Sequence, residues 1–189
     1  MKVNVGISNR HVHLNRETLD LLFGDNFELE ILKELSQKVQ FASKQTVTIK
    51  GPKGQIENVR ILGPVRPYNQ IEISKTDSFK LGLNPPIRNS GDLSGSEKIT
   101  IIGPNAEITL NEGCIIATRH IHISFDQLSK LGLKNNDMVA IKTNTEKSSI
   151  LYNVYLKASE DATFELHLDT DDANANMLKQ GDEVEIIYE

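Results

Sequence analysis

Short runs in which aliphatic and polar residues alternate occupy most of the chain, and this pattern is typical of half-buried β-strands. Six of the runs form three pairs, and a turn of Gly, Pro or polar residues joins the members of each pair. We expect hairpins over 45–62, 98–110 and 138–156, and a last strand over 183–188. Many short strands with turn residues between them favour small β-barrels over a parallel α/β sheet.

A strand–helix unit recurs four times along the chain, and such repeats reflect the architecture of a fold. Each unit reads aliphatic, ligand-type residue, aliphatic, then a helix-capping residue and a short amphipathic segment that ends near glycine. Residues 71–83 align with residues 121–133 at a constant offset of 50. The expected capping residues are Asn15, Ser74, Ser124 and, for the fourth helix, Asp169 or a neighbour such as Thr170. Left-handed glycines are expected to end three of the helices: Gly24, Gly82 and Gly132.

The hairpins and the repeated units together predict a mainly β fold with short α-helices. We expect two small β-barrels, capped by the helices and built from the internally repeated strand–helix units. The first barrel half is placed at residues 1–118 and the second at residues 119–189. An exchange of a strand between the two halves remains open.

The five histidines of the chain are concentrated in the repeated units. Four of them form two His-x-His pairs, whereas a random arrangement would give about 0.1 such pairs. Residues two apart on a strand point to the same face, so each pair presents two imidazoles together. The central residues of the four units are His13, Glu72, His122 and His167. Packing explains the aliphatic positions of the repeat, but it gives no reason for ligand-type residues at its centre.

Imidazole and carboxylate groups are common metal ligands, and the repeat suggests two sets of three. One set is His11, His13 and Glu72, and the other is His120, His122 and His167. Three protein ligands leave an open coordination position, which is typical of catalytic metal sites. Imidazole-rich ligation favours zinc and leaves cobalt, iron, manganese and nickel open.

Three arginines lie close to the expected ligands in the sequence. Arg66 lies between Pro64 and Pro67, which stiffen its backbone. A guanidinium held there suits an anion near the metal, and a surface ion pair is an equally open interpretation. Arg10 and Arg119 directly precede the His pairs and fall on the opposite strand face, so we expect structural roles for them.

Composition narrows the choice of partners. The net charge of −5 over 189 residues argues against a nucleic-acid-binding surface. No run approaches the roughly 20 apolar residues of a membrane span, and the N-terminus lacks a signal-peptide core. The single cysteine, Cys114, lies in an apolar run, so we expect a core residue and no internal disulfide. A cytoplasmic protein without nucleic-acid or membrane partners is expected.

Six motifs resemble one known family over essentially the whole chain, at residues 8–14, 59–64, 71–74, 90–93, 119–122 and 166–171. The family is the phosphate propanoyltransferases of the PduL type, which are phosphotransacylases. The resemblance implies a pair of helix-capped β-barrels with a dinuclear zinc site between them, and assembly as a homodimer. The chain begins close to its first strand, without the extension that targets some members to microcompartments, which again favours the cytoplasm.

The resemblance also implies roles for individual residues. His11, His13 and Glu72 match the ligands of the zinc that can meet the sulfur of coenzyme A. His120, His122 and His167 match the ligands of a second, more hydrated zinc, and Arg66 matches the arginine that handles phosphate. Contacts with coenzyme A fall at Ser8, Lys33, Arg60, Phe79 and Asn174, with Phe79 available to stack on the adenine.

The function implied is reversible transfer of a short acyl group, acetyl or propionyl, between coenzyme A and phosphate. The partners would be coenzyme A or acyl-CoA and phosphate or acyl phosphate. Two alternatives stay open at this point. One is a dinuclear zinc metallohydrolase acting on a small phosphoester or amide, and the other is a metal-buffering or scaffold protein without enzymatic activity.

Overall fold

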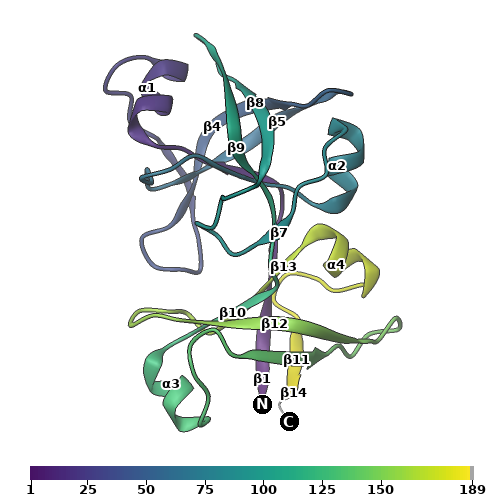
Figure 1. Ribbon diagram of the computed structural model, residues 1–189. Coiled ribbons are helices and arrows are strands. Elements are labelled where there is room, and N and C mark those ends of the chain that lie inside the picture. Colours follow the sequence, from purple (N-terminus) through teal and green to yellow (C-terminus); the bar gives the residue numbers. More distant parts are fainter. Residues whose placement is uncertain (188–189) are drawn as a thin grey trace. The chain divides into compact units, whose positions relative to one another are not determined.

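The computed structural model describes residues 1–187, which form a mainly β fold with four short helices (Figure 1). The chain divides into two compact units. We call Arg10–Ala117 the first barrel, and Met1–Asn9 together with Thr118–Glu189 the second barrel. The predicted fold class, two small β-barrels with short helices, is confirmed. No helix within residues 1–187 has the length and apolar character needed to cross a membrane.

Six strands close the first barrel. They are β2 (His11–His13), β4 (Phe41–Lys50), β5 (Gln55–Gly63), β6 (Gln70–Glu72), β8 (Glu97–Ile102) and β9 (Glu107–Ala117). Strand β2 pairs antiparallel with β6, and each of these two has a parallel outer partner, β5 for β2 and β9 for β6. Strands β4 and β8 pair with β5 and β9 and with each other, which completes the ring. Two short strands attach at its edges, β3 (Ile31–Glu34) and β7 (Ile87–Arg88).

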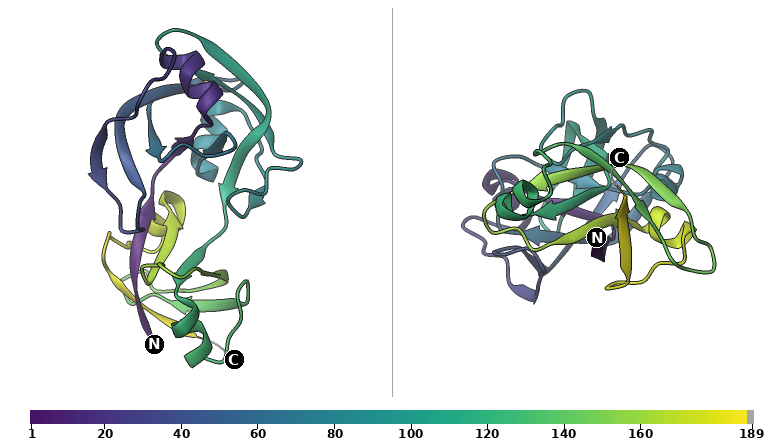
Figure 2. Two further views of the ribbon diagram at one scale, coloured as in Figure 1. Left: turned by 90° about the vertical axis from the view of Figure 1, so that its left-hand side faces the viewer. Right: turned by 90° about the horizontal axis from the view of Figure 1, so that it is seen from below.

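The second barrel closes in the same way. Its strands are β1 (Lys2–Ser8), β10 (His120–Ile123), β11 (Met138–Lys142), β12 (Ile150–Ala158), β13 (Glu165–Asp169) and β14 (Glu183–Ile187). Strands β10 and β13 form the central antiparallel pair, and their parallel outer partners are β12 and β1. Strands β11 and β14 close the ring, and β14 lies beside β1 in Figures 1 and 2. The expected last strand reached residue 188, which lies outside the described residues.

The boundary between the two units differs from the expected division in one strand. Residues 1–9 were expected in the first half, but β1 pairs with β13 and β14 of the second barrel. Val3 and Val5 of β1 are buried in the core of the second barrel. The alternation of Val3 and Val5 with polar residues shows that one face of this strand is buried. It does not show which strand pairs with it, and that strand, β13, lies more than 150 residues away in the chain. The chain therefore returns to the second barrel at Thr118.

Each barrel has its own apolar core, and the central strands contribute one face to it. Val12 and Ile71 are fully buried in the first barrel, as are Ile121 and Leu166 in the second. Because side chains alternate along a strand, the residues that flank these aliphatics point away from the core. The two His-x-His pairs lie on that outward face.

The four helices follow the central strands and the expected caps are confirmed. They are α1 (Arg16–Phe23), α2 (Lys75–Leu81), α3 (Phe125–Lys130) and α4 (Thr170–Ala175). Asn15, Ser74, Ser124 and Asp169 each accept a hydrogen bond from the backbone N–H three residues later. Gly82 ends α2 in the left-handed conformation, and Gly132 follows α3 with a φ of 68°. The prediction for Gly24 was wrong, because its φ of 112° and ψ of 157° lie outside the left-handed helical region.

Candidate metal centres

The first triad, His11, His13 and Glu72, is assembled by the central strand pair of the first barrel. His11 lies opposite Glu72 in the antiparallel register of β2 and β6, and His13 follows on the same face of β2. Nε2 of His11 lies 3.5 Å from Oε2 of Glu72, and one ligand atom from each residue lies within 4.8 Å of the others. Ligand atoms around a tetrahedral zinc ion are about 3.3 Å apart, given bonds of about 2.0–2.1 Å. The spacing of the triad therefore suits a single ion.

His13 supplies the clearest sign that the first triad fits a metal. Its Nδ1 is buried and has no hydrogen-bond partner within the described residues, although such atoms are nearly always paired in folded proteins. Burial is the main cause that lowers the pKa of His13 to about 3, and the charges of His11 and Arg66 act in the same direction. The imidazole is thus neutral near pH 7, which is the form that binds metal.

The second triad, His120, His122 and His167, has the same construction in the second barrel. His120 lies opposite His167 in the register of β10 and β13, and His122 follows on the same face. The three rings lie with their centroids 4.7–5.1 Å apart, and ligand atoms again fall within 4.8 Å of one another. The structure therefore brings together each set of three ligands that the repeat predicted.

The protonation of the second triad also suits a metal ion. Nδ1 of His120 lies 2.8 Å from the carbonyl oxygen of Thr118, so Nδ1 carries the proton and Nε2 is left to bind an ion. Burial, with the charge of Lys157 next in size, holds the pKa of His120 well below its usual range. Burial and the neighbouring His167 lower the pKa of His122 to about 4. Both imidazoles are therefore neutral at pH 7.

Each triad also has an outer partner that the sequence analysis missed. In the first barrel, Nε2 of Gln70 donates to Oε1 of Glu72 at 2.6 Å and to Oγ of Ser90 at 2.8 Å. In the second barrel, Oε2 of Glu165 lies 2.7 Å from Nε2 of His167. Gln70 and Glu165 both stand two residues before the third ligand, on the same strand face. That spacing repeats the His-x-His pattern and was the signal available in the sequence.

Arg66 lies near the first triad. Its backbone N–H donates to the carbonyl of Leu14, just after the His pair, and its Nη1 donates to the hydroxyls of Tyr68 and Ser90 at 3.2 and 3.3 Å. Within residues 1–187 no carboxylate forms an ion pair with Arg66, so the surface ion pair considered above is not found. Its charge helps to lower the pKa of His13, so the guanidinium acts electrostatically on the first triad.

The expected coenzyme A contacts are spread over both units. Ser8 ends β1 and Asn174 is exposed on α4, both in the second barrel. Lys33 is exposed on β3, and the ring of Phe79 on α2 is 69% exposed, with Nζ of Lys75 5.2 Å from its centroid. Arg60 on β5 donates to the backbone carbonyls of Ser43 and Lys44. No hydrogen bond joins any two of the five within residues 1–187, and their role stays a prediction.

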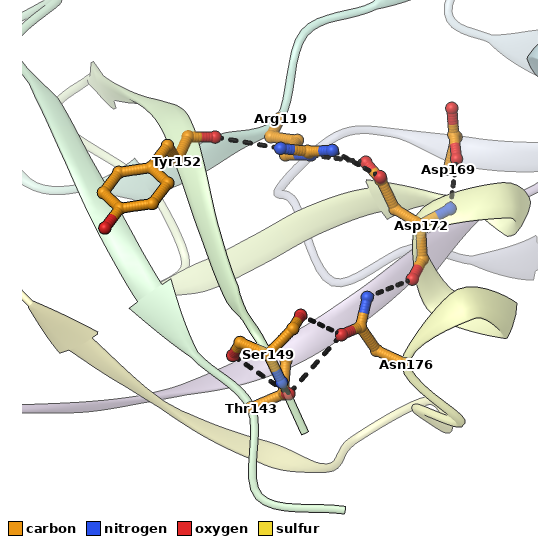
Figure 3. A network of polar contacts seen from close by, with 7 residues as sticks. All are labelled: Arg119, Thr143, Ser149, Tyr152, Asp169, Asp172 and Asn176. Carbon is orange, nitrogen blue, oxygen red and sulfur yellow. Dashed lines mark hydrogen bonds and ion pairs between the residues drawn. The ribbon is translucent and has the colours of Figure 1, made fainter. Parts of the chain in front are cut away.

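Arg10 and Arg119 have the structural roles expected from strand alternation. Arg10 forms a two-pronged ion pair with Asp77 in the first turn of α2, with both contacts at 2.8 Å. Arg119 forms the equivalent pair with Asp172 in the first turn of α4, with both contacts at 2.7 Å, and also donates to the carbonyl of Tyr152 (Figure 3). Each arginine thus ties a His-bearing strand to the helix that follows its partner strand.

The polar network around Asp172 extends further into the second barrel. The side-chain amide of Asn176 donates a hydrogen bond to the carbonyl oxygen of Asp172 (Figure 3). Its Oδ1 accepts hydrogen bonds from the hydroxyls of Ser149 and Thr143. The N-cap Asp169 accepts from the N–H of Asp172 at the start of the same helix. These bonds hold α4 at the end of β13, directly after His167.

These features define a class of protein: a double β-barrel with a His-rich group, suited to a metal ion, on the central strands of each barrel. The profile of the phosphate propanoyltransferase family matches residues 4–179. The chain is therefore a member of the phosphate propanoyltransferase family, a family of phosphate acyltransferases, and the resemblance found in its motifs is confirmed.

Individual relatives agree with the family assignment. A phosphate propanoyltransferase of Thermotoga maritima is 51% identical over 184 residues, covering 97% of this chain and 88% of the relative. One from Rhodopseudomonas palustris is 44% identical over 185 residues, with 98% and 82% covered. A third, from Lachnoclostridium phytofermentans, is 46% identical over 186 residues, with 98% and 87% covered.

Proposed function

We propose that this chain catalyses the reversible transfer of a short acyl group, acetyl or propionyl, between coenzyme A and inorganic phosphate. Membership of the phosphate propanoyltransferase family carries the proposal. In the forward direction a phosphate oxygen forms a bond to the carbonyl carbon of acyl-CoA. The carbon–sulfur bond breaks, and coenzyme A leaves as a thiolate with the electron pair.

We propose further that the two triads hold two zinc ions that act as one dinuclear centre, with other divalent transition metals as possible replacements. The unpaired Nδ1 of His13 and the unprotonated Nε2 of His120 support this assignment. Bound ions would supply Lewis-acid stabilisation of the thioester oxyanion and of the thiolate.

Arg66 is proposed to bind the phosphate. Tyr68 and Ser90 both accept hydrogen bonds from Nη1, and no other guanidinium bond of Arg66 occurs within residues 1–187. Nε and Nη2 are therefore left to grip two phosphate oxygens, which is the geometry that arginine favours. Ser90 also accepts from Gln70, so a chain of hydrogen bonds links Arg66 to the triad carboxylate of Glu72.

The transfer is proposed to proceed directly, without an acyl-enzyme. Cys114 is fully buried, and burial raises the pKa of its thiol to about 12, which leaves it in the unreactive protonated form. The expectation of a core cysteine is thereby confirmed. Direct attack by phosphate needs the two reactants held side by side, which is a task for Arg66 and the triads.

The remaining parts of the proposal concern binding and assembly. Ser8, Lys33, Arg60, Phe79 and Asn174 are proposed to contact coenzyme A. The homodimer and the cytoplasmic location stay predictions. The hydrolase alternative is not favoured, because the matched family and its relatives bear the name of a transferase.

One assay separates the candidate functions. The purified protein is incubated with acetyl phosphate and coenzyme A, and with propionyl phosphate in a parallel reaction, while thiol and thioester are followed. Thiol loss with matching thioester formation supports the transferase. Phosphate release that does not depend on thiol would instead indicate the hydrolase, and the absence of both activities would indicate a scaffold.

A further inference from the structure

Glu165 is a buried carboxylate that touches the second triad without belonging to it. It lies on β13, opposite His122 in the register with β10, and is 8% exposed. Its Oε2 lies 2.7 Å from Nε2 of His167. Within residues 1–187 the other ring nitrogen of His167, Nδ1, makes no hydrogen bond. One nitrogen of this imidazole is thus engaged by a carboxylate, and the other remains available as a ligand.

The position of Glu165 relative to its triad has an equivalent in the first barrel, and Gln70 occupies it. Gln70 lies opposite His13, as Glu165 lies opposite His122, and each stands two residues before the third ligand on the same strand. Gln70 holds one oxygen of Glu72 at 2.6 Å, and Glu165 holds one nitrogen of His167 at 2.7 Å. In the first barrel the amide of Gln70 stands behind the carboxylate of Glu72, whereas in the second barrel the carboxylate of Glu165 stands behind the imidazole of His167. The carboxylate and its uncharged partner have therefore changed places on the strand. Each centre contains one carboxylate, as a ligand in the first barrel and behind a ligand in the second.

Gly6 on β1 provides the space for this contact. Gly6 pairs with His167 in the parallel register of β1 and β13. A Cβ added at Gly6 would lie 2.8 Å from Cδ of Glu165 and 3.0 Å from Cδ2 of the His167 ring. The carboxyl group and the imidazole thus pack together against bare backbone. Any larger residue at this position would displace one of them.

We propose that Glu165 is a positioning residue for the metal centre formed by His120, His122 and His167. Its carboxylate accepts a hydrogen bond from one ring nitrogen of His167, and so fixes the tautomer and makes the other nitrogen a better donor to an ion. Gly6 is required because it leaves room for this pair. The inference rests on the proposed metal-binding function and adds a residue to it.

The test measures zinc affinity rather than activity. Metal is removed from the purified protein, and Zn²⁺ is returned in competition with a chromophoric chelator, so that the affinity of each site is obtained. H120A identifies which of the two affinities belongs to the second triad. E165A is expected to weaken that site about 10–100-fold, the usual effect of removing such an outer partner. The other site should stay within about twofold of the original protein.

Two further variants separate positioning from general damage. E165Q keeps the shape and still offers an oxygen that accepts from the ring, so it should weaken the same site less than E165A does. Q70A is the matched control in the first barrel, and it should weaken the other site. With Co²⁺ in place of Zn²⁺, E165A should also change the visible absorption of the second centre, which a purely structural defect elsewhere would leave unaltered.

The outcomes are distinguishable. An original protein that binds no zinc with useful affinity would contradict the proposed metal sites themselves. Two zinc sites with E165A affinities equal to those of the original protein would overturn the role of Glu165 alone, and so would an equal loss at both sites. If E165A does not fold, E165Q decides: a loss confined to the second site supports the proposal, and unchanged affinities overturn it.

Discussion

The two barrels share one topology and differ in the chemistry that they place on it. In each barrel a central antiparallel strand pair carries a His-x-His pair opposite the third candidate ligand. The first barrel presents two imidazoles and a carboxylate, and the second presents three imidazoles. A carboxylate ligand in the first triad would neutralise part of an ion's charge directly, whereas the carboxylate of Glu165 in the second barrel stands behind His167 and would act on an ion only through that imidazole. The comparison teaches that the strand register decides which residues face one another in each triad, whereas the exchange of a carboxylate between two positions of one strand decides whether that carboxylate would bind an ion directly.

Removing one ligand from each barrel is the strongest way to break this comparison. H11A and H120A each delete a residue from one triad, and each variant is expected to bind one zinc ion where the original protein is expected to bind two. Lewis-acid stabilisation of several kcal/mol predicts that the rate of thioester formation falls about 10²–10³-fold in both. Metal analysis and initial rates provide the measurement. Full activity in either variant would show that the corresponding barrel has no catalytic part.

Substitution of Arg66 tests whether a residue beside the first triad binds phosphate. R66A removes two charge-assisted hydrogen bonds, together worth about 3 kcal/mol, so kcat/KM for phosphate should fall about 10²-fold. The metal content should not change, because Arg66 is not a member of either triad. Steady-state kinetics with varied phosphate provide the readout.

A matched arginine in the same barrel serves as the control. Arg88 on β7 lies 3.8 Å from the exposed carboxylate of Asp92, and R88A should leave the kinetics unchanged. Equal kinetics of R66A and the original protein would remove Arg66 from the mechanism.

The stability of both metal-free barrels should fall at low pH, and it should fall more steeply in the second barrel, where the pKa of His120 is lowered as well as that of His122. Burial lowers the pKa of His13 to about 3 and that of His122 to about 4, against an ordinary value of 6.5. Below pH 6.5 the unfolded chain binds protons that the folded protein does not, so stability is lost as the pH falls from 6.5 toward those values. Each histidine is expected to cost about 2 kcal/mol between pH 6.5 and pH 5.

Urea unfolding of the metal-free protein at the two pH values measures this loss. His13→Gln and His122→Gln should each reduce it by about 2 kcal/mol, because glutamine does not titrate. A pH dependence that neither substitution changes would show that the buried imidazoles gain protons without unfolding. If only one of the two substitutions changed the pH dependence of unfolding, only that histidine would be buried so completely that it cannot gain a proton in the folded protein.

The sequence predicted which residues the two triads bring together, because two simple regularities determine them. The period of two along a strand places His11 with His13, and His120 with His122, on one face. The repeat then identified Glu72 and His167, which the structure places opposite the first histidine of each pair. Caps at Ser74 and Asp169 could also be predicted, because they depend on residues only three positions apart.

Features that depend on distant partners or on exposed residues could not be predicted. The pairing of β1 with β13 needs a choice among all strands, and alternation at Val3 and Val5 reports only which face is buried. All four residues of β3 are exposed, so this strand has no alternating signal, and β7 spans two residues. The two-residue spacing of Glu165 from His167 was a signal in the sequence, but it does not say which polar residue of a strand contacts a triad, and only the contact with His167 identified Glu165.

The smallest expected effect concerns the arginines that precede the two His pairs. Arg10→Met and Arg119→Met each remove one half-buried ion pair and keep an unbranched side chain. Exposed pairs contribute little and fully buried ones several kcal/mol, so we expect a loss of about 1–2 kcal/mol in the free energy of unfolding. Asp77 is more deeply buried than Asp172, at 6% against 21% side-chain exposure, and removal of Arg10 should cost slightly more.

The double variants R10M/D77N and R119M/D172N determine whether these losses belong to the pairs. Once the partner carboxylate is neutral, removal of the arginine should cost less than it does alone, and urea unfolding measures the difference. Zinc affinity should change little in any of these variants, because the ion pairs hold α2 and α4 rather than the imidazoles. If R119M weakened the second centre as strongly as H120A, the clamp on α4 would position the metal ligands as well. The difference between the barrels would then lie in how their helices support the centre, and not only in the exchange of a carboxylate.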